Sequence, residues 1–296
     1  MRAAVIAALV TALSACGAPS VSTQASVTPE ALAKAKDLAG QAQSLFQQRR
    51  DPQALRQAID LWEQALAQDP SDVTSAVMVA RALQLLGEGF LHRQPADQRV
   101  ALYQRGTDAT LRALEAISPR FAQLIGQGVA IETAVDALQS TAAPLVYWYA
   151  MDLGSYARAK GAVEGLKQKD RLVALMSWVH DRDPRYHFYG ADRFFGAFYA
   201  AVPEAFGGSL QKSRAHFQAA LDGAPQYTGT YLLMAAFYAT RASDRPLFDR
   251  LLGQVESAGP CKANGQVPCV IPGWEPETEI DQKRAAVLEQ RAARLF

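Results

Sequence analysis

The stretch IDLWEQALAQDP at residues 59–70 shows the pattern that decides the fold. Trp62 is followed three residues later by Ala65 and four residues later by Leu66, so these three side chains share one face of a helix. The small Ala65 allows a second helix to approach that face closely. Pro70 then ends the helix, because proline lacks the backbone N–H and its ring clashes with the preceding turn. The stretch therefore predicts a helix that packs against a neighbour and turns.

The same pattern returns near the other end of the chain, in HFQAALDGAP at residues 216–225. Without a gap, Phe217 aligns with Trp62, Ala220 with Ala65, Leu221 with Leu66 and Pro225 with Pro70. Two more helix-patterned segments run into Ser118-Pro119 and Asp183-Pro184. The pattern resembles the second helix of a tetratricopeptide repeat, although these prolines are spaced more widely and unevenly than its period of about 34 residues. We therefore expect an all-α fold, an irregular array of TPR-like helical hairpins; an unrelated bundle with proline turns is the alternative.

Almost the whole chain has the apolar spacing of helices. The period-two alternation of branched and aromatic residues that is typical of strands is absent from the sequence. Thr28-Pro29-Glu30 has the residues of a helix start, with a capping Thr, a first-turn Pro and an acid. The expected helices are 29–49, 52–68, 71–92, 96–117, 121–139, 142–160, 162–181, 185–202, 208–223, 226–242, 244–257 and 276–295.

The N-terminus has the composition of an export signal. A charged start and about ten apolar residues precede Leu13-Ser14-Ala15-Cys16. This motif is similar to the lipobox of bacterial lipoproteins, in which the Cys is lipidated and becomes the first mature residue. We expect a lipoprotein signal peptide at 1–15, lipidation of Cys16, a flexible tether at 16–28 and one helical domain at 29–296. An ordinary cleaved signal is the alternative.

Charge and motif content favour a non-enzymatic protein. Lys and Arg number 30 and Asp and Glu 29, so the chain has no basic footprint for nucleic acid. The four histidines do not form a His-Glu-x-x-His motif. Glu277 and Glu279 lie in a polar, helix-starting stretch, and we expect both to be solvated. No catalytic group, cofactor or metal is expected.

Cys261 and Cys269 lie in a loop rich in Pro and Gly. In an oxidising compartment, such a pair usually forms a disulfide. A zinc site needs about four nitrogen or sulfur ligands, and no His or further Cys lies near the pair. We therefore expect a disulfide rather than a metal site.

Aromatic residues are concentrated between residues 147 and 238. Aromatics at helical spacing are usually core residues, but binding sites for small molecules are also concave and aromatic. We expect a subset of them to line a hydrophobic ligand channel. The candidates are Tyr147, Trp148, Tyr149, Phe194, Phe195, Phe198, Tyr199 and Tyr231.

The segments 143–150 and 192–217 carry a family resemblance. The latter holds DRFFGAFYA, then Pro203, Gly207-Gly208-Ser209 and His216-Phe217. With the lipobox, these features resemble the T-component (TatT) lipoproteins of tripartite ATP-independent periplasmic (TRAP) transporters, from about residue 30 to the C-terminus. The Cys261–Cys269 loop departs from the family pattern.

The resemblance implies that the protein is an accessory component of a TRAP-type solute transport system. It also implies a homo-oligomer, which is a trimer in characterised members. It would bind or channel a small hydrophobic ligand with a periplasmic solute-binding protein, the P-component. The alternative is a TPR-type scaffold for protein–protein interaction in the cell envelope. Because Gly17 is not the Asp linked to inner-membrane retention in enteric bacteria, the expected location is the periplasmic face of the outer membrane.

The lipid anchor gives the first testable prediction. Cys16→Ser removes the thiol that would carry the lipid, so the variant should move from the membrane pellet to the soluble fraction on cell fractionation. A variant that still pellets with membranes at high salt would contradict the anchor.

Overall fold

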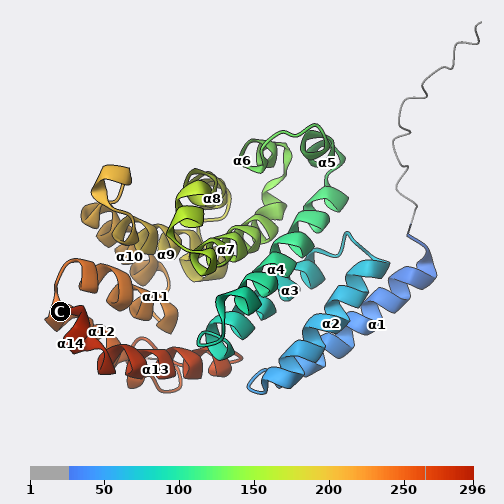
Figure 1. The fold of residues 1–296 in the computed structure, drawn as a ribbon. Helices are drawn as coiled ribbons and strands as arrows, with labels where there is room; N and C mark the ends of the chain where they lie inside the picture. The colour runs from blue at the N-terminus through green and yellow to red at the C-terminus, as the bar shows by residue number, and fades with distance from the viewer. Residues whose placement is uncertain (1–26, 264) are drawn as a thin grey trace, which may run out of the picture.

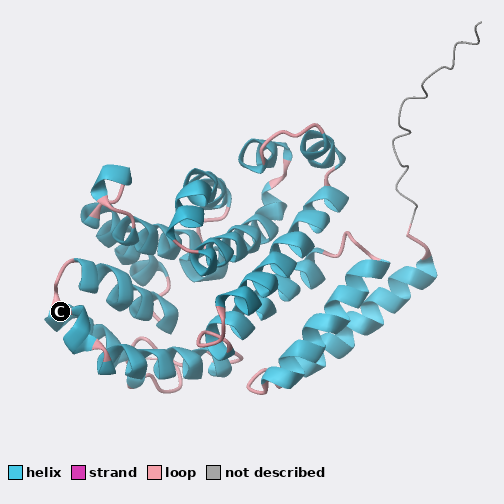
Figure 2. Ribbon diagram, in the orientation of Figure 1, coloured by secondary structure: helices cyan, strands magenta, loops and turns pink. Residues whose placement is uncertain are grey.

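The computed structural model describes residues 27–263 and 265–296. The expected signal peptide, Cys16 and the expected tether up to residue 26 lie outside the described residues. The described chain contains fourteen α-helices and short 3₁₀ and π segments, with no strand among them (Figure 2). Consecutive helices pack as antiparallel pairs (Figure 1). The all-α, helical-hairpin fold expected from the sequence is therefore confirmed.

The N-terminal half begins with the hairpin of α1 (Pro29–Phe46) and α2 (Pro52–Gln68). Next come α3 (Val73–Leu85), the π turn η1 (Leu86–Phe90) and α4 (Ala96–Ile117). Short elements follow: α5 (Pro119–Gly126), α6 (Ile131–Ala134), η2 (Val135–Ala137) and η3 (Ser140–Ala142). The central helix α7 (Ala143–Lys160) then packs against α4 and against its successor, α8 (Ala162–Arg182).

The C-terminal half pairs α9 (Tyr186–Ala201) with α10 (Leu210–Gly223), joined through η4 (Glu204–Phe206). It continues with α11 (Thr228–Leu233), the π segment η5 (Met234–Ala239) and α12 (Arg245–Glu256). After the disulfide loop come α13 (Glu275–Gln290) and α14 (Ala292–Leu295). In Figure 1, α13 (red) starts near the turn between α1 and α2 (blue) and runs away from it toward the C-terminus.

The proline turns end helices where the sequence predicted. α2, α4, α8 and α10 each end two residues before a proline, namely Pro70, Pro119, Pro184 and Pro225, respectively. The expected starts are also capped: the Thr28 hydroxyl accepts from the N–H of Ala31, and Ser209 accepts from the N–H of Lys212. The single helix predicted at 121–139 is wrong. It breaks after Gly126, where Gly128 adopts a φ of +78° that ends a right-handed helix.

The aligned residues of the repeat pattern are core residues in both halves. Trp62 and Phe217 are fully buried, as are Ala65 and Ala220. Gly196 of α9 allows the close approach of α10, because a Cβ there would lie 2.7 Å from the Phe217 ring. The Ser213 hydroxyl fixes the same crossing by donating to the Gly196 carbonyl over 2.6 Å.

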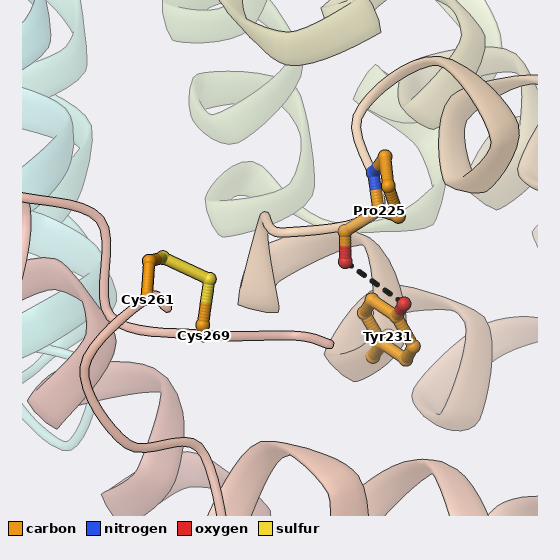
Figure 3. Close-up of a disulfide and its surroundings, with 4 residues drawn as sticks. All are labelled: Pro225, Tyr231, Cys261 and Cys269. Carbon is orange, nitrogen blue, oxygen red and sulfur yellow. Dashed lines mark hydrogen bonds between the residues drawn. A yellow bond between two sulfur atoms is a disulfide. The ribbon is translucent and has the colours of Figure 1, made fainter. Parts of the chain in front are cut away.

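A disulfide joins Cys261 and Cys269, with 5.0 Å between their Cα atoms (Figure 3). The Cys269 N–H donates to the carbonyl of Gln226, in the turn between α10 and α11. Nearby, the Tyr231 hydroxyl donates to the Pro225 carbonyl over 2.9 Å (Figure 3). The loop that leads into α13 is thus attached to the turn that follows α10.

Within the described residues, no helix combines the length and the hydropathy needed to cross a membrane.

Phe217→Ala tests the α9–α10 contact. Removal of a fully buried ring opposite Gly196 should lower the free energy of unfolding by about 3–5 kcal/mol, measured by urea denaturation. The exposed neighbour Gln218 provides the control, since Gln218→Ala should change stability by about 0.5 kcal/mol or less. A loss below about 1 kcal/mol for Phe217→Ala would contradict the packing.

Candidate functional site

A cavity of about 770 Å³ lies where the N-terminal and C-terminal helical pairs meet. Its walls come from α3, α7, the start of α9, the turn after α10 and the loop before α13. The lining residues are Val77, Met78, Arg81, Trp148, Arg185, Tyr186, His187, Phe188, Tyr189, Asp222, Gly223, Ala224, Gln226 and Trp274. This volume is within the usual range for small-molecule sites, about 300–1,000 Å³.

The start of α9 has an unusual backbone. His187, Phe188 and Tyr189 have φ values of 49°, 56° and 59°, the left-handed region, and none of them is glycine. Each such residue costs roughly 1–2 kcal/mol relative to the right-handed form. We call this segment the left-handed turn. Its three side chains line the cavity, so the backbone that places them there is strained, as is common at functional sites.

Aromatic rings form most of the wall around the turn. The Phe188 ring stacks on Tyr227 with a centroid distance of 4.6 Å and meets the edge of Trp274 at 4.9 Å. The His187 ring lies between two indoles, 4.9 Å from Trp148 and 5.5 Å from Trp274. An apolar ligand would therefore meet ring faces and edges on several sides.

A few polar groups lie among these rings. The Trp148 Nε1–H donates to the Tyr186 hydroxyl over 3.0 Å. Burial raises the pKa of Tyr186 to about 12, so the phenol keeps its proton and can itself donate to a ligand. Burial lowers the pKa of His187 well below 6.5, and the charges of Arg193 and Arg81 lower it further. The imidazole is therefore neutral, with one donor and one acceptor nitrogen.

Two arginines and a glutamate hold the Trp274 side of the cavity. The Arg81 guanidinium lies 4.0 Å from the centre of the Trp274 ring and pairs with Glu277 over 2.9 Å. Arg49 binds the other carboxylate oxygen of Glu277 at 2.8 Å. The expectation that Glu277 is solvated is wrong, because α13 folds back onto two arginines and leaves the side chain 14% exposed. Glu279 remains partly exposed, with 42% of its side chain accessible, and pairs with Arg50.

Two of the eight ligand-channel candidates lie on cavities. Trp148 lines the large one. Tyr231 lines a second cavity of about 330 Å³ between α10, η5 and α12. Tyr147 lies directly behind the first, its ring 5.2 Å from that of Tyr186 and against Gly190. Tyr149 is half-buried and packs on the central core.

The other four candidates lie on α9, where Phe195 and Tyr199 contact His216 of α10 and Phe194 packs on the central core. Phe195 is buried, and Phe194 and Phe198 form a half-buried stacked pair with centroids 5.7 Å apart. Tyr199 stacks on His216 at 5.7 Å. The His216 Nδ1 in turn lies 2.8 Å from the carboxylate of buried Asp192. The structure thus places the candidates on α7, α9 and α11, and among them only Trp148 lines the large cavity, with Tyr147 behind it.

Several cavity residues did not stand out as site residues in the sequence. His187, Phe188 and Trp274 were not candidates, although the aromatic density around residues 186–189 is visible in the chain. No sequence signal marks the left-handed turn, since the residues that usually adopt the left-handed conformation are Gly, Asn and Asp. Trp274 reaches the cavity because the loop before α13 returns to the N-terminal helices, and the local spacing of apolar residues does not predict this return. Among the described residues, no cluster of three or more His, Cys, Asp or Glu could hold a metal.

His187 gives a prediction for pH dependence. The unfolded chain binds a proton near pH 6.5 and the folded chain does not, so folded-state stability should fall as the pH drops below about 6.5. Between pH 7.5 and 5.5, the wild type should lose up to about 1.4 kcal/mol more than His187→Gln, measured by urea unfolding. Equal losses in the two proteins would show that His187 titrates normally in the folded state.

The comparisons with known proteins identify the family. The family described as TRAP transporter T-component matches residues 51–296, which include every residue of the cavity. No curated protein matches the chain. The T-component is a transporter accessory component, and its family is not an enzyme family. The match extends over most of the chain and agrees with the all-helical paired fold, so this protein belongs to the TRAP transporter T-component (TatT) family.

Proposed function

We propose that this protein is a non-enzymatic accessory component of a TRAP-type transport system that binds or channels a small hydrophobic ligand. The observation that carries this proposal is the large cavity. It has the volume of a small-molecule site, and aromatic rings from α7, α9 and the loop before α13 form its walls. We assign ligand binding to this cavity rather than to the stacked rings of Phe194 and Phe198 on α9.

The polar groups of the cavity restrict the ligand further. Tyr186 and neutral His187 offer hydrogen bonds without a formal charge, and Arg81 is already engaged with Glu277. Arg185 and Asp222 add one charge of each sign to the lining. A flat, apolar molecule with one or two polar atoms fits this lining best. Such a ligand would bury its apolar body against Phe188, Trp148 and Trp274, and its polar atoms would select the orientation.

The envelope context is part of the proposal. Lipidation of Cys16 would anchor the protein at the periplasmic face of the outer membrane, and a periplasmic solute-binding protein would exchange ligand with it. We propose a homotrimer as the working assembly. Exposed apolar side chains support contact with another protein chain: Val163 and Leu166 on α8 and Phe206 in η4 are at least half exposed, and Lys169 of α8 contacts the Phe206 carbonyl.

A TPR-type scaffold is the second candidate function. The smaller cavity supports it, because Arg214, Asp244 and Arg250 lie there beside Met234 and Leu247. This mixed lining would suit a peptide segment better than a small apolar molecule.

Filling the large cavity tests the proposal. Val77→Trp places an indole at the α3 wall, so it should remove small molecules that co-purify with the wild type in native mass spectrometry. It should also weaken binding of the neutral apolar probe N-phenyl-1-naphthylamine at least tenfold. Thr74→Trp, at an exposed position of the same helix outside the cavity lining, is the matched control and should change neither.

Circular dichroism must show an unchanged helical signal for both variants. If Val77→Trp folds normally and keeps the wild-type ligand and probe affinity, the cavity is not the ligand site and the scaffold function is favoured.

A further inference from the structure

The left-handed turn must be held in place by its surroundings, since three consecutive residues without glycine would otherwise favour a right-handed helix. The hydrogen bond from the Tyr189 N–H to the Arg185 carbonyl is long, at 3.3 Å. Side-chain contacts around the turn therefore add to its backbone hydrogen bonds.

Arg193 makes the most direct of these contacts. Its Nη1–H donates to the carbonyl of Phe188, the middle residue of the turn. Its guanidinium also lies over the Tyr227 ring, 4.4 Å from the centroid. The Tyr227 ring in turn stacks on the Phe188 ring. One side chain thus binds the backbone of the turn and supports the ring against which the turn packs.

The cost of placing Arg193 there suggests a specific role. The residue is only 4% exposed, and among the described residues no carboxylate lies within 4 Å of its guanidinium nitrogens. Burial of a cation without an ion-pair partner is unfavourable. The Phe188 carbonyl and the Tyr227 ring supply compensating contacts, beside the more distant charge of Asp281 and the Tyr147 hydroxyl. Through the first two, the position of the charge is coupled to the conformation of the turn.

We propose that Arg193 is the positioning residue of the ligand cavity: it holds residues 187–189 in the left-handed conformation and so places the His187 and Phe188 rings in the cavity wall. Arg193 does not itself line the cavity and acts through the turn. The inference rests on the proposed function, because it assumes that this cavity is where ligand binds.

The shape of the guanidinium explains why arginine is required. It is planar, so it can donate from its edge to the Phe188 carbonyl while its face covers Tyr227. A lysine ammonium keeps the charge but is a compact group without that planar geometry. Without these contacts, the turn should relax toward a right-handed helix. The His187 and Phe188 side chains would then leave their positions beside Trp148 and Trp274.

Arg193→Gln and Arg193→Lys test the proposal in the full chain, with N-phenyl-1-naphthylamine as the probe. We expect the probe dissociation constant to rise at least tenfold in Arg193→Gln and by a smaller factor in Arg193→Lys. Leu252→Ala is the control, since Leu252 is buried in the C-terminal core and does not line the cavity. It should lower the melting temperature but leave the probe affinity unchanged.

Amide hydrogen exchange gives a readout that does not depend on ligand. Peptides that cover 186–191 should exchange at least tenfold faster in Arg193→Gln, while those of α12 keep wild-type rates. Wild-type exchange at 186–191 in both Arg193 variants would overturn the inference, whatever the probe shows.

The two proposals fail in different ways. If the wild type binds no probe and yields no co-purified molecule, the proposed function fails, and the exchange rates alone decide the role of Arg193. If the wild type binds the probe and both Arg193 variants bind it equally well, the positioning role is wrong and the cavity remains the ligand site. Equal losses of affinity in Leu252→Ala and Arg193→Gln would indicate a general effect on stability and would also overturn the positioning role.

Discussion

The carboxylate of Glu277, shared by Arg49 and Arg81, is the interaction on which the arrangement of the helices depends most. It joins α13 to the turn after α1 and to α3 across 228 and 196 residues of sequence, respectively. Arg49 is 3% exposed, so loss of the carboxylate would leave a buried cation unpaired, which typically costs several kcal/mol. Because Trp274 precedes α13 and stacks on Arg81, the same ion pairs complete the cavity wall. The disulfide loop supports the same arrangement from the other side, through the backbone hydrogen bond from the Cys269 N–H to the Gln226 carbonyl.

The cavity combines a fixed wall with a strained one. Trp148 belongs to α7, whose residues are packed into the central core, and Trp274 is held by Arg81. Opposite them, the left-handed turn keeps His187 and Phe188 in a backbone conformation that needs outside support. A site of this kind can be largely formed before the ligand arrives, which limits the ordering cost of binding. It can also change when the supporting contacts change, so the turn is the element through which a ligand or a partner protein would affect the site.

The sequence predicted the local features of the fold better than the site. Residues such as Pro70, Pro225, Thr28 and Ser209 act on their own helices, so their effects on helix ends and starts were predictable. The family was also recognisable from the α9–α10 motif. The wall of the large cavity was not recognisable from the sequence, because it depends on contacts between distant segments and on backbone dihedrals. Phe195 and Tyr199 have the aromatic spacing of a channel helix but face α10, whereas Trp274, in a loop, reaches the cavity. Glu277 was expected in solvent, since nothing local to α13 indicates its arginine partners.

The central claim is that ligand binds between the left-handed turn and the two indoles of Trp148 and Trp274. A crystal structure of the protein soaked with a brominated naphthalene tests this most directly, because anomalous scattering locates bromine without reference to the protein density. The account predicts a bromine peak in the large cavity, within van der Waals distance of Phe188 and at least one of the two indoles. A peak confined to the stacked rings of Phe194 and Phe198, or to the smaller cavity beside Tyr231, would contradict it.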